Sequence, residues 1–270
     1  MNRNSTSWKT LLKVAVVTSA FTATGLAQAV SGTLAVGGTR TELGWSVSNL
    51  QGSGSLTFSS SLLGALNAGG IELVEIAPAV LTTTTSPRGA YLTGSVAAPI
   101  QALDGDFDGS TLTITGVDTT GGATLKATAD GFTNTGGSLT IQNIFVDVAA
   151  KKVFADIIGA NGVGAKNNIE LWSVATLTGK TSFPAVPGVT SSTNTLSGLT
   201  INATAYGYFS KALGLTDVGN TAMGSITDYG SMTSNISVFA APVPEPSTYL
   251  MMGVGLMALA GVQAARQRKQ

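Results

Sequence analysis

The chain has 270 residues, only 10% of which are charged, and its formal net charge is zero. Glycine occurs 34 times, whereas cysteine and histidine are absent. These two absences exclude disulfides, thiol nucleophiles, zinc sites built on Cys or His, and every mechanism that needs an imidazole base. Carboxylate, Lys or Tyr chemistry stays open.

The first 29 residues predict a secretory signal peptide. Three basic residues come first, an apolar stretch follows up to Leu26, and the small-residue triplet "AQA" precedes Val30. This order is typical of a signal peptide and places the signal peptidase site at Ala27 and Ala29, directly before Val30. The alternative is an amphipathic first helix of the fold.

Residues 30–240 predict a secreted, β-rich domain. Short runs of alternating apolar and polar residues each begin at a Gly or Ser turn, which is the pattern of strands. The clearest runs are "GSLTF" at 54–58, "GSTLTITG" at 109–116, "GGATLKATA" at 121–129, "GGSLTIQN" at 136–143 and "SGLTINATAYGYF" at 197–209. The predicted fold class is all-β, an antiparallel β-sandwich or meander with loops rich in Gly, Ser and Thr.

Two local elements can be predicted more closely. A short helix is expected over 61–67, ended by Gly69 and Gly70. The segment "IFVDVAAKKVFADII" at 144–158 predicts a hairpin whose connection is Ala149 to Lys152.

The segment "LDGDFDGST" is the sharpest candidate for a metal site. Asp104, Asp106 and Asp108 alternate and are followed by Gly109, as in the first half of a calcium-binding loop. The twelfth position from Asp104 is Thr115, so the bidentate Glu of an EF-hand is missing. The alternatives are a calcium site in a loop of another kind and an acidic turn without an ion.

Paired carboxylates would be needed for hydrolysis of glycans. The candidates are Glu72 with Glu75, Asp147 with Asp156, and Glu170. Their positions on strands and hairpins favour structural roles.

Aromatic side chains offer a second way to bind sugars. Tyr206, Tyr208 and Phe209 fall on one expected strand, with Trp45 and Trp172 elsewhere. Such residues would stack on sugar rings, although an aromatic residue on a strand more often packs in the core.

After a last strand expected near 235–239, the chain predicts a linker, a membrane helix and a basic tail. The linker is 241–247. Residues 248–265 are about 18 residues without a charge, roughly 27 Å as a helix, which just spans the hydrocarbon core of a bilayer. The basic tail, 266–270, would stay in the cytoplasm. The alternative is a buried core helix.

The segment "VPEPSTYLMMGVGLMALAGVQAARQRKQ" resembles the PEP-CTERM sorting signal of Gram-negative bacteria. Its Pro-Glu-Pro triplet, short membrane helix and basic cluster occur in the family's order. By position, the recognition triplet is Pro244, Glu245 and Pro246, and the basic stop is Arg266, Arg268 and Lys269. The resemblance implies that a membrane-embedded exosortase recognises and cuts the tail, and it associates the chain with bacteria that make exopolysaccharide and biofilms.

Together, the two ends predict an exported protein that passes through an inner-membrane-anchored intermediate to the cell surface or extracellular matrix. Exosortase and signal peptidase are the expected partners during export, and exopolysaccharide is an expected partner afterwards. We expect a structural or adhesive protein rather than an enzyme, with no cofactor unless calcium binds. The alternatives are a surface module that binds polysaccharide or calcium, and a carboxylate-dependent glycan hydrolase.

A nucleic-acid partner is not expected, because the body is mildly acidic. Six of the 14 basic residues and one of the 14 acidic residues lie at the two ends, so residues 30–243 hold 13 acids and 8 bases. This balance lacks the basic footprint of a nucleic-acid-binding protein.

Overall fold

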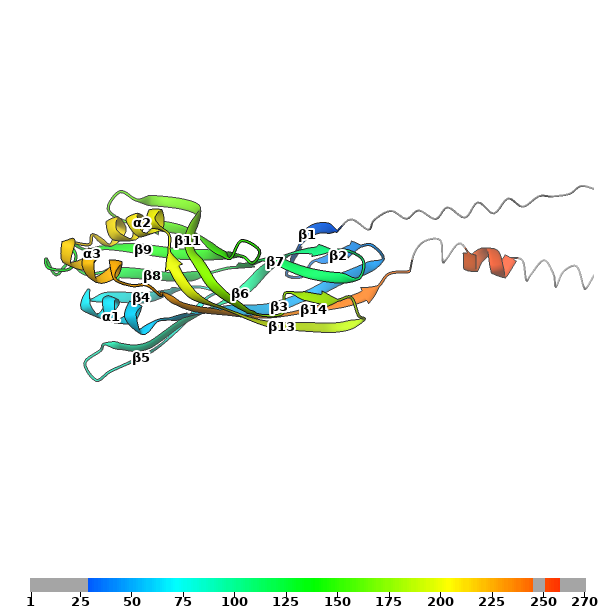
Figure 1. Cartoon of the computed structure of the whole chain (residues 1–270), viewed down its shortest axis with the longest axis horizontal. Helices are drawn as coiled ribbons and strands as arrows, with labels where there is room; N and C mark the ends of the chain where they lie inside the picture. Colours follow the sequence, from blue (N-terminus) through cyan, green and yellow to red (C-terminus); the bar gives the residue numbers. More distant parts are fainter. Residues whose placement is uncertain (1–28, 245–250, 258–270) are drawn as a thin grey trace, which may run out of the picture.

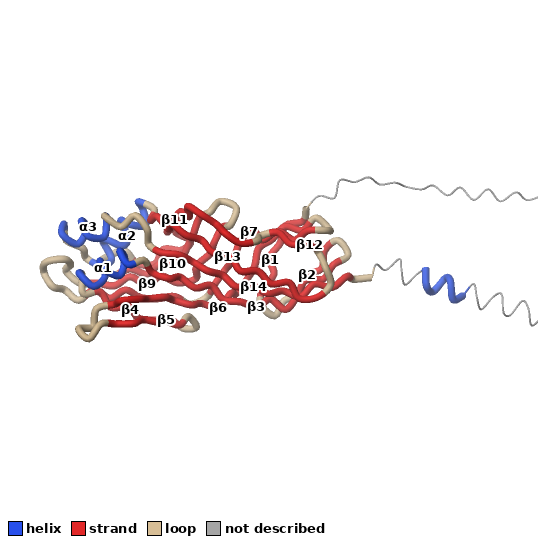
Figure 2. The backbone as a smooth tube through the Cα atoms, turned by 60° about the horizontal axis from the view of Figure 1, so that its bottom comes forward, coloured by secondary structure: helices blue, strands red, loops and turns tan. Residues whose placement is uncertain are grey.

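The computed structural model describes residues 29–244 and 251–257. They form an elongated body of strands, with helices α1, α2 and α3 gathered at one end (Figures 1 and 2). The elements in chain order are β1 (Val30–Ala35), β2 (Thr39–Glu42), β3 (Trp45–Phe58), α1 (Ser60–Ala68), β4 (Ile71–Ile76), β5 (Val80–Thr85), β6 (Tyr91–Phe107), β7 (Thr111–Thr119), β8 (Gly122–Ala127), β9 (Gly137–Asp147), β10 (Lys152–Gly159), β11 (Gly164–Gly179), β12 (Ser182–Pro184), β13 (Gly188–Ile201), α2 (Ala203–Leu213), α3 (Asp217–Gly224) and β14 (Gly230–Pro242).

The described strands belong to one antiparallel, 14-stranded sheet that closes on itself. Its main path is β12-β7-β6-β3-β14-β13-β11-β10-β9-β8-β4, with β1 and β5 paired to β6 and β2 paired to β3. A further pairing joins β7 to β9, through Gly116 with Asp147 and Asp118 with Phe145. The ladder therefore returns to its start and encloses a core. The predicted antiparallel all-β fold is confirmed.

Side chains join the edge strand β4 to β5 and to the first residue of β6, and join the end of α1 to the same residue. Glu75 Oε2 accepts a hydrogen bond from Leu81 N (3.1 Å), and Tyr91 Oη accepts one from Leu73 N (3.0 Å). Asn67, at the end of α1, bonds both the N–H (2.8 Å) and the carbonyl (2.9 Å) of Tyr91. These contacts satisfy backbone groups that would otherwise be exposed at the sheet edge.

The predicted hairpin is present with nearly the expected turn. β9 ends at Asp147 and β10 begins at Lys152, and these two residues pair. Asp147 Oδ1 accepts a hydrogen bond from Ala150 N (2.7 Å), and Lys151 adopts a positive φ of 55°. The turn is thus built by neighbouring residues, as expected of a carboxylate that bonds nearby backbone.

The predicted short helix is also present, as α1. Its N-terminus is capped by Ser59, whose Oγ accepts a hydrogen bond from Leu62 N (3.0 Å). Leu62, Leu63 and Leu66 are buried, so the helix packs one apolar face on the sheet. It ends at Gly69, as the sequence predicted.

The expectation of one strand over 197–209 is wrong. β13 ends at Ile201 and α2 follows directly. Asn202 caps the helix by accepting a hydrogen bond from Thr204 N (2.9 Å), and Gly214 ends it in the left-handed conformation, with φ of 63°. The buried residues of α2 recur with helical spacing: Ala205, Phe209, Ala212 and Leu213. The helix cap at Asn202 and the stop at Gly214 favour a helix here, although the residue types alternate as they do in a strand.

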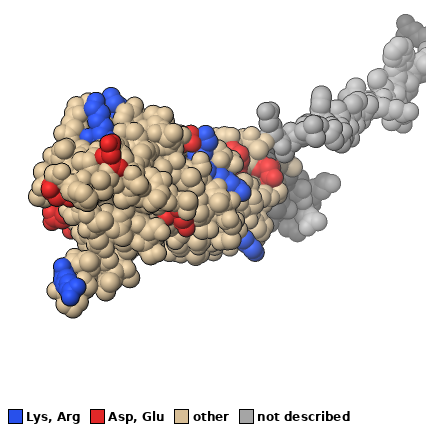
Figure 3. Space-filling view, turned by 60° about the vertical axis from the view of Figure 1, so that its left-hand side comes forward, with Lys and Arg blue, Asp and Glu red and all other residues tan. Residues whose placement is uncertain are grey.

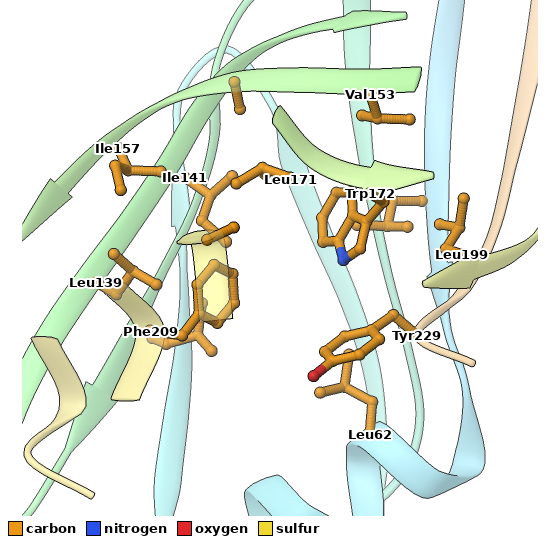
Figure 4. Packing of buried hydrophobic residues seen from close by; sticks show 14 of the residues in the cluster. Leu62, Leu139, Ile141, Val153, Ile157, Leu171, Trp172, Leu199, Phe209 and Tyr229 are labelled. Carbon is orange, nitrogen blue, oxygen red and sulfur yellow. The ribbon is translucent and has the colours of Figure 1, made fainter. Parts of the chain in front are cut away.

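Besides a small cluster of Ala79, Val96, Ala98 and Ala123, two main buried clusters fill the described body. The larger lies beneath the helices and contains Leu139, Ile157, Leu171 and Leu199, all fully buried (Figure 4). The smaller lies toward the opposite end and includes Leu34, Leu50, Ile100, Ile114 and Ile236. Burial of aliphatic side chains from distant strands is what holds the long sheet closed.

The raised pKa of Tyr229, which lies in the larger cluster, leads us to predict that the protein loses stability in alkali. Burial, with a smaller effect of the Tyr206 charge, raises the pKa of Tyr229 from 10.0 to about 12. From about pH 10 the unfolded chain loses this proton while the folded chain keeps it, so the free energy of unfolding should fall by roughly 1 kcal/mol per pH unit up to about pH 12.

Urea unfolding of wild type and Tyr229→Phe between about pH 9 and pH 12 measures this effect. In the variant, the free energy of unfolding should lose the part of its pH dependence that Tyr229 causes. It should keep the part that Tyr206 causes, because burial raises the pKa of Tyr206 as well. Equal slopes for both proteins would contradict the assignment.

Candidate functional site

β1 begins at the residue that is predicted to become the first of the mature chain after cleavage by signal peptidase. Val30 is the first residue of β1 and pairs with Phe107 of β6. Ala29 is exposed and precedes the strand, while Ala27 lies outside the described residues. A cut between Ala29 and Val30 would therefore leave every described strand intact.

We accordingly expect the exported protein to begin at Val30. N-terminal sequencing of protein recovered from the periplasm or the medium checks this start. A start after Ala35 would remove β1 and its pairing with β6, and would contradict the predicted site.

At the other end of the body, the last strand leads directly into the predicted sorting segment. β14 extends to Pro242, which pairs with Trp45, and Val243 N donates a hydrogen bond to Gly44 O (2.8 Å). The strand is thus longer than the expected 235–239 and runs into the predicted linker. Pro244 is exposed. The other residues of the predicted triplet and basic stop lie outside the described residues: Glu245, Pro246, Arg266, Arg268 and Lys269.

Part of the predicted membrane segment is described. Residues 251–257 are helical, and their large apolar side chains are exposed: Met251, Met252, Val254, Leu256 and Met257. Within 29–244 and 251–257, no helix has both the length and the apolar character needed to cross a bilayer. The rest of the predicted span, 248–250 and 258–265, lies outside the described residues.

The start of β1 and the end of β14 lie at the end of the body opposite the helices (Figure 1). Trp45 at the start of β3 pairs with both Pro242 of β14 and Glu42 of β2. Arg40 of β2 donates a hydrogen bond from Nη2 to the carbonyl of Ser31 in β1 (3.1 Å). The start of the mature chain and the start of the sorting segment are therefore held at one pole.

The three aspartates of the predicted calcium loop are not gathered in one loop. Asp104 and Asp106 lie on β6, where Asp104 Oδ1 accepts from Thr33 Oγ1 (2.5 Å) and Asp106 Oδ1 accepts from Ser31 Oγ (2.6 Å). Asp108 occupies the following turn. Among the described residues no group of three or more metal-ligating side chains comes together.

The turn after β6 explains the hydrogen bonding of Asp108. Its Oδ1 accepts bonds from Ser110 N (2.8 Å), Ser110 Oγ (2.8 Å) and Thr111 N (2.6 Å). These bonds, first that from the Ser110 backbone, lower the pKa of Asp108. The carboxylate is already engaged as an acceptor in the β6–β7 turn.

Because all three aspartates already accept hydrogen bonds from protein groups, we expect millimolar calcium to leave the melting temperature of the protein unchanged. A ligand that prefers the folded state would raise the melting temperature by mass action. A rise in wild type that is lost in the triple variant Asp104→Asn, Asp106→Asn, Asp108→Asn would instead establish a calcium site, and magnesium serves as the control ion.

Asp118 was not predicted as a candidate. Burial raises the pKa of this β7 carboxyl, and the negative charge of Asp104 on β6 raises it further. The two strands pair with Ala102 opposite Asp118 and Gly116 opposite Asp104. The proximity depends on strand register, so the sequence carries no local signal for it.

The carboxylates considered for glycan hydrolysis lie on β4, β9, β10 and β11. Glu72 and Glu75 lie on β4, and Glu75 accepts a hydrogen bond from a backbone N–H of β5. Asp147 closes the β9–β10 turn, and Asp156 accepts a bond from a backbone N–H of β11 (2.9 Å). Glu170 forms an ion pair with a lysine of β10 (2.7 Å). Each of the bonded carboxylates contributes to local structure.

The aromatic side chains considered for sugar stacking do not form an exposed strand platform. Tyr206, Tyr208 and Phe209 lie on α2, and Phe209 is buried in the larger cluster. Trp172 is only 3% exposed. The interpretation of these residues as a strand platform is wrong, because the segment is helical.

Trp172 instead faces a small apolar cavity of about 70 Å³ inside the larger cluster. Its lining includes Leu62, Phe209 and Tyr229, and the indole nitrogen points into the space between them (Figure 4). Trp172 Nε1 is buried without a hydrogen-bond partner. Such a site forms only when distant segments pack together, so the sequence could not reveal it.

The surface of the body carries few charges. In the view of Figure 3, Lys, Arg, Asp and Glu are scattered singly over a largely uncharged face. The described residues contain two ion pairs, Arg40 with Glu42 and Lys152 with Glu170. Contacts with a partner would therefore depend on hydrogen bonds and shape more than on charge attraction.

The comparison with protein families identifies the end of the chain. Residues 242–269 match the PEP-CTERM protein-sorting motif. The match begins at Pro242, the last residue of β14, and covers both the Pro-Glu-Pro triplet and the basic cluster. No curated protein and no solved structure matches the chain.

Proposed function

We propose that this chain, which carries the PEP-CTERM motif of an exosortase-sorted exported protein, is a structural or adhesive protein of the cell surface or extracellular matrix. The motif indicates export, a membrane-anchored intermediate and processing by exosortase. Signal peptidase would act first, before Val30. Our proposal adds the final location, which is an exopolysaccharide matrix, and the adhesive role.

The arrangement of the two chain ends carries this proposal. The sorting motif begins where β14 ends, and β1 starts at the same pole (Figure 1). The folded body would project from this pole, and its helix-capped end would lie farthest from the membrane. A body held at one end presents its long sides and free end to neighbouring polymers, as an adhesive protein requires.

A non-catalytic role is also supported by the structural bonds of the candidate acids. The five carboxylates considered for glycan hydrolysis come from β4, β9, β10 and β11, and four of them have structural hydrogen bonds or an ion pair. A glycosidase needs two carboxyl groups about 5 to 10 Å apart across a substrate. Release of reducing ends from polysaccharide by the purified protein would overturn this part of the proposal.

Cohesion of the producing cells tests the proposed role. Deletion of the gene should reduce the fraction of cells retained in aggregates and the polysaccharide retained with them. The full chain should restore both, whereas a chain ending at Pro242 should be secreted without restoring them. Unchanged cohesion in the deletion strain would contradict the proposal.

The second candidate is a surface module that binds polysaccharide. It is favoured by a specific observation, the regular rows of uncharged polar side chains on one side of the sheet.

A further inference from the structure

We propose that the outer face of β13, β14 and β3 binds a neutral polysaccharide through a registered array of hydroxyl and amide groups. This inference deepens the proposed function, on which it rests, by naming the contact surface and the chemistry of the partner. The face is defined by alternate residues of 191–197, 231–237 and 51–57, called the polar array below.

The composition of the polar array is uniform. All the outward residues of these three segments are Ser, Thr, Asn or Gln, and all are exposed or half-buried. The residues between them turn inward, among them Leu196, Ile236 and Leu56, which are buried. The face therefore combines an underside anchored by buried side chains with an outer surface that bears no charge.

Strand register places the polar groups in rows. Thr193 of β13 pairs with Asn235 of β14, which pairs with Ser53 of β3. In the next row Thr195 pairs with Thr233, which pairs with Ser55. Neighbouring strands lie about 4.8 Å apart and alternate residues about 6.8 Å apart, so donors and acceptors recur on a regular grid.

Hydrogen bonds within the array orient some of these groups. Thr193 Oγ1 donates to Asn235 Oδ1 (2.8 Å), and Thr195 Oγ1 and Thr233 Oγ1 lie 3.5 Å apart. A hydroxyl retains donor or acceptor capacity after one such bond, and an amide retains its two N–H donors. The array can thus bond further hydroxyls laid over it.

An exposed aromatic side chain adjoins the array. Beyond the row that contains Ser191 and Ser237, Val189 pairs with Phe239 on the same side of the sheet. Phe239 is 40% exposed and Val189 is 67% exposed. An apolar pad beside rows of hydroxyls suits a sugar polymer, because sugars present both hydroxyls and C–H faces.

The absence of charge in the array favours a neutral polymer. An acidic polysaccharide would require basic side chains, and none is present among these outward residues. Binding through hydrogen bonds and apolar contact should also be insensitive to salt, unlike attraction between charges.

The test is affinity electrophoresis of the full-length protein in nonionic detergent, through native gels containing hydroxyethylcellulose, dextran or alginate. The triple variant Thr193→Val, Thr195→Val, Thr233→Val removes three hydroxyls and keeps the β-branched shape. The matched control, Thr41→Val, Thr82→Val, Thr84→Val, removes three exposed hydroxyls from β2 and β5.

We expect at least one of the neutral polymers to retard wild type and control equally at low and high salt. The triple variant should bind at least about tenfold more weakly, since each lost hydrogen bond weakens binding. Phe239→Ala should also weaken binding, while all variants keep the wild-type melting temperature within a few degrees.

Equal retardation of the triple variant and the control would overturn the inference, as would retardation by alginate alone or none by any polymer. The cohesion experiment separates the two proposals. If deletion of the gene abolishes cohesion and the triple variant restores it fully, the adhesive function stands and the polar array is not its contact surface.

Discussion

Replacing Glu245 with Ala should block processing of the exported chain while leaving its body folded. The residue lies within the matched sorting motif, two positions after Val243, whose N–H makes the last described backbone bond to the body. The apolar run and the basic stop remain unchanged, so the transfer energetics that drive membrane insertion are unchanged. Full-length protein should then accumulate at the inner membrane, with its body in the periplasm.

Membrane fractionation with an epitope tag in the body measures this outcome, in cells with and without the exosortase. The matched control is Glu42→Ala, which removes an acid of β2 at the same end of the body and only a surface ion pair with Arg40 (3.2 Å). Deleting 248–270 should release a soluble body, since β14 is complete at Pro242. If the Glu245 variant and wild type have the same size and location in both strains, the triplet is not a recognition element.

The parts of the molecule that could be predicted from sequence are those set by neighbouring residues. The β9–β10 turn depends on Asp147 and the residues that directly follow it. α1 depends on a cap at Ser59 and a stop at Gly69. The sorting signal is a linear pattern of residue types, so its recognition needed no fold.

The errors and omissions have a common physical cause. The strand expected over 197–209 followed the alternation of residue types, but a cap at Asn202 and the packing of Phe209 against distant strands decided for a helix. The closure of the sheet through β7 and β9 also depends on contacts between segments. A shift of one residue in strand register would turn the other side chains outward.

The polar array is the clearest example of a feature that depends on contacts between distant segments. Ser53 and Asn235 pair although they are far apart in the sequence. The alternation of Ser and Thr in each strand is visible in the sequence, but the rows exist only because three registers coincide. The predicted aromatic platform lay on residues that the structure folds into α2, whereas Phe239, the exposed aromatic beside the array, is not among the residues that the sequence predicts for sugar binding.

Replacing Asn134 with Leu should cause one of the largest losses of stability in the body. Asn134 is fully buried. Its Nδ2 donates to Gly69 O (2.9 Å) at the end of α1, and its Oδ1 accepts from Gly136 N (2.9 Å) before β9. Its backbone forms a bridge with Leu215, between α2 and α3. The Asn134 side chain thus joins the end of α1 to the segment before β9, at the helical end of the body.

The substitution leaves the buried carbonyl of Gly69 and the half-buried N–H of Gly136 without these partners, and each buried group left unpaired costs about 1 to 3 kcal/mol. We expect a loss of about 2 to 5 kcal/mol in the free energy of unfolding, and a melting temperature lower by roughly 5 to 15 °C. Thermal and urea unfolding of the purified protein measure both quantities.

Asn194→Leu is the matched control. Asn194 is also buried, but its Oδ1 has no hydrogen-bond partner and its Nδ2 bonds only Ser192 Oγ (2.8 Å). Ser192 Oγ keeps its own bond to Lys180 O (2.8 Å) when that amide is removed. The control should therefore lose no more than about 1 kcal/mol, because it strands no backbone group and removes an oxygen that was already unsatisfied. Equal losses for the two variants would mean that the cost reflects the volume of the leucine side chain, and that the hydrogen bonds of Asn134 do not hold the helical end together.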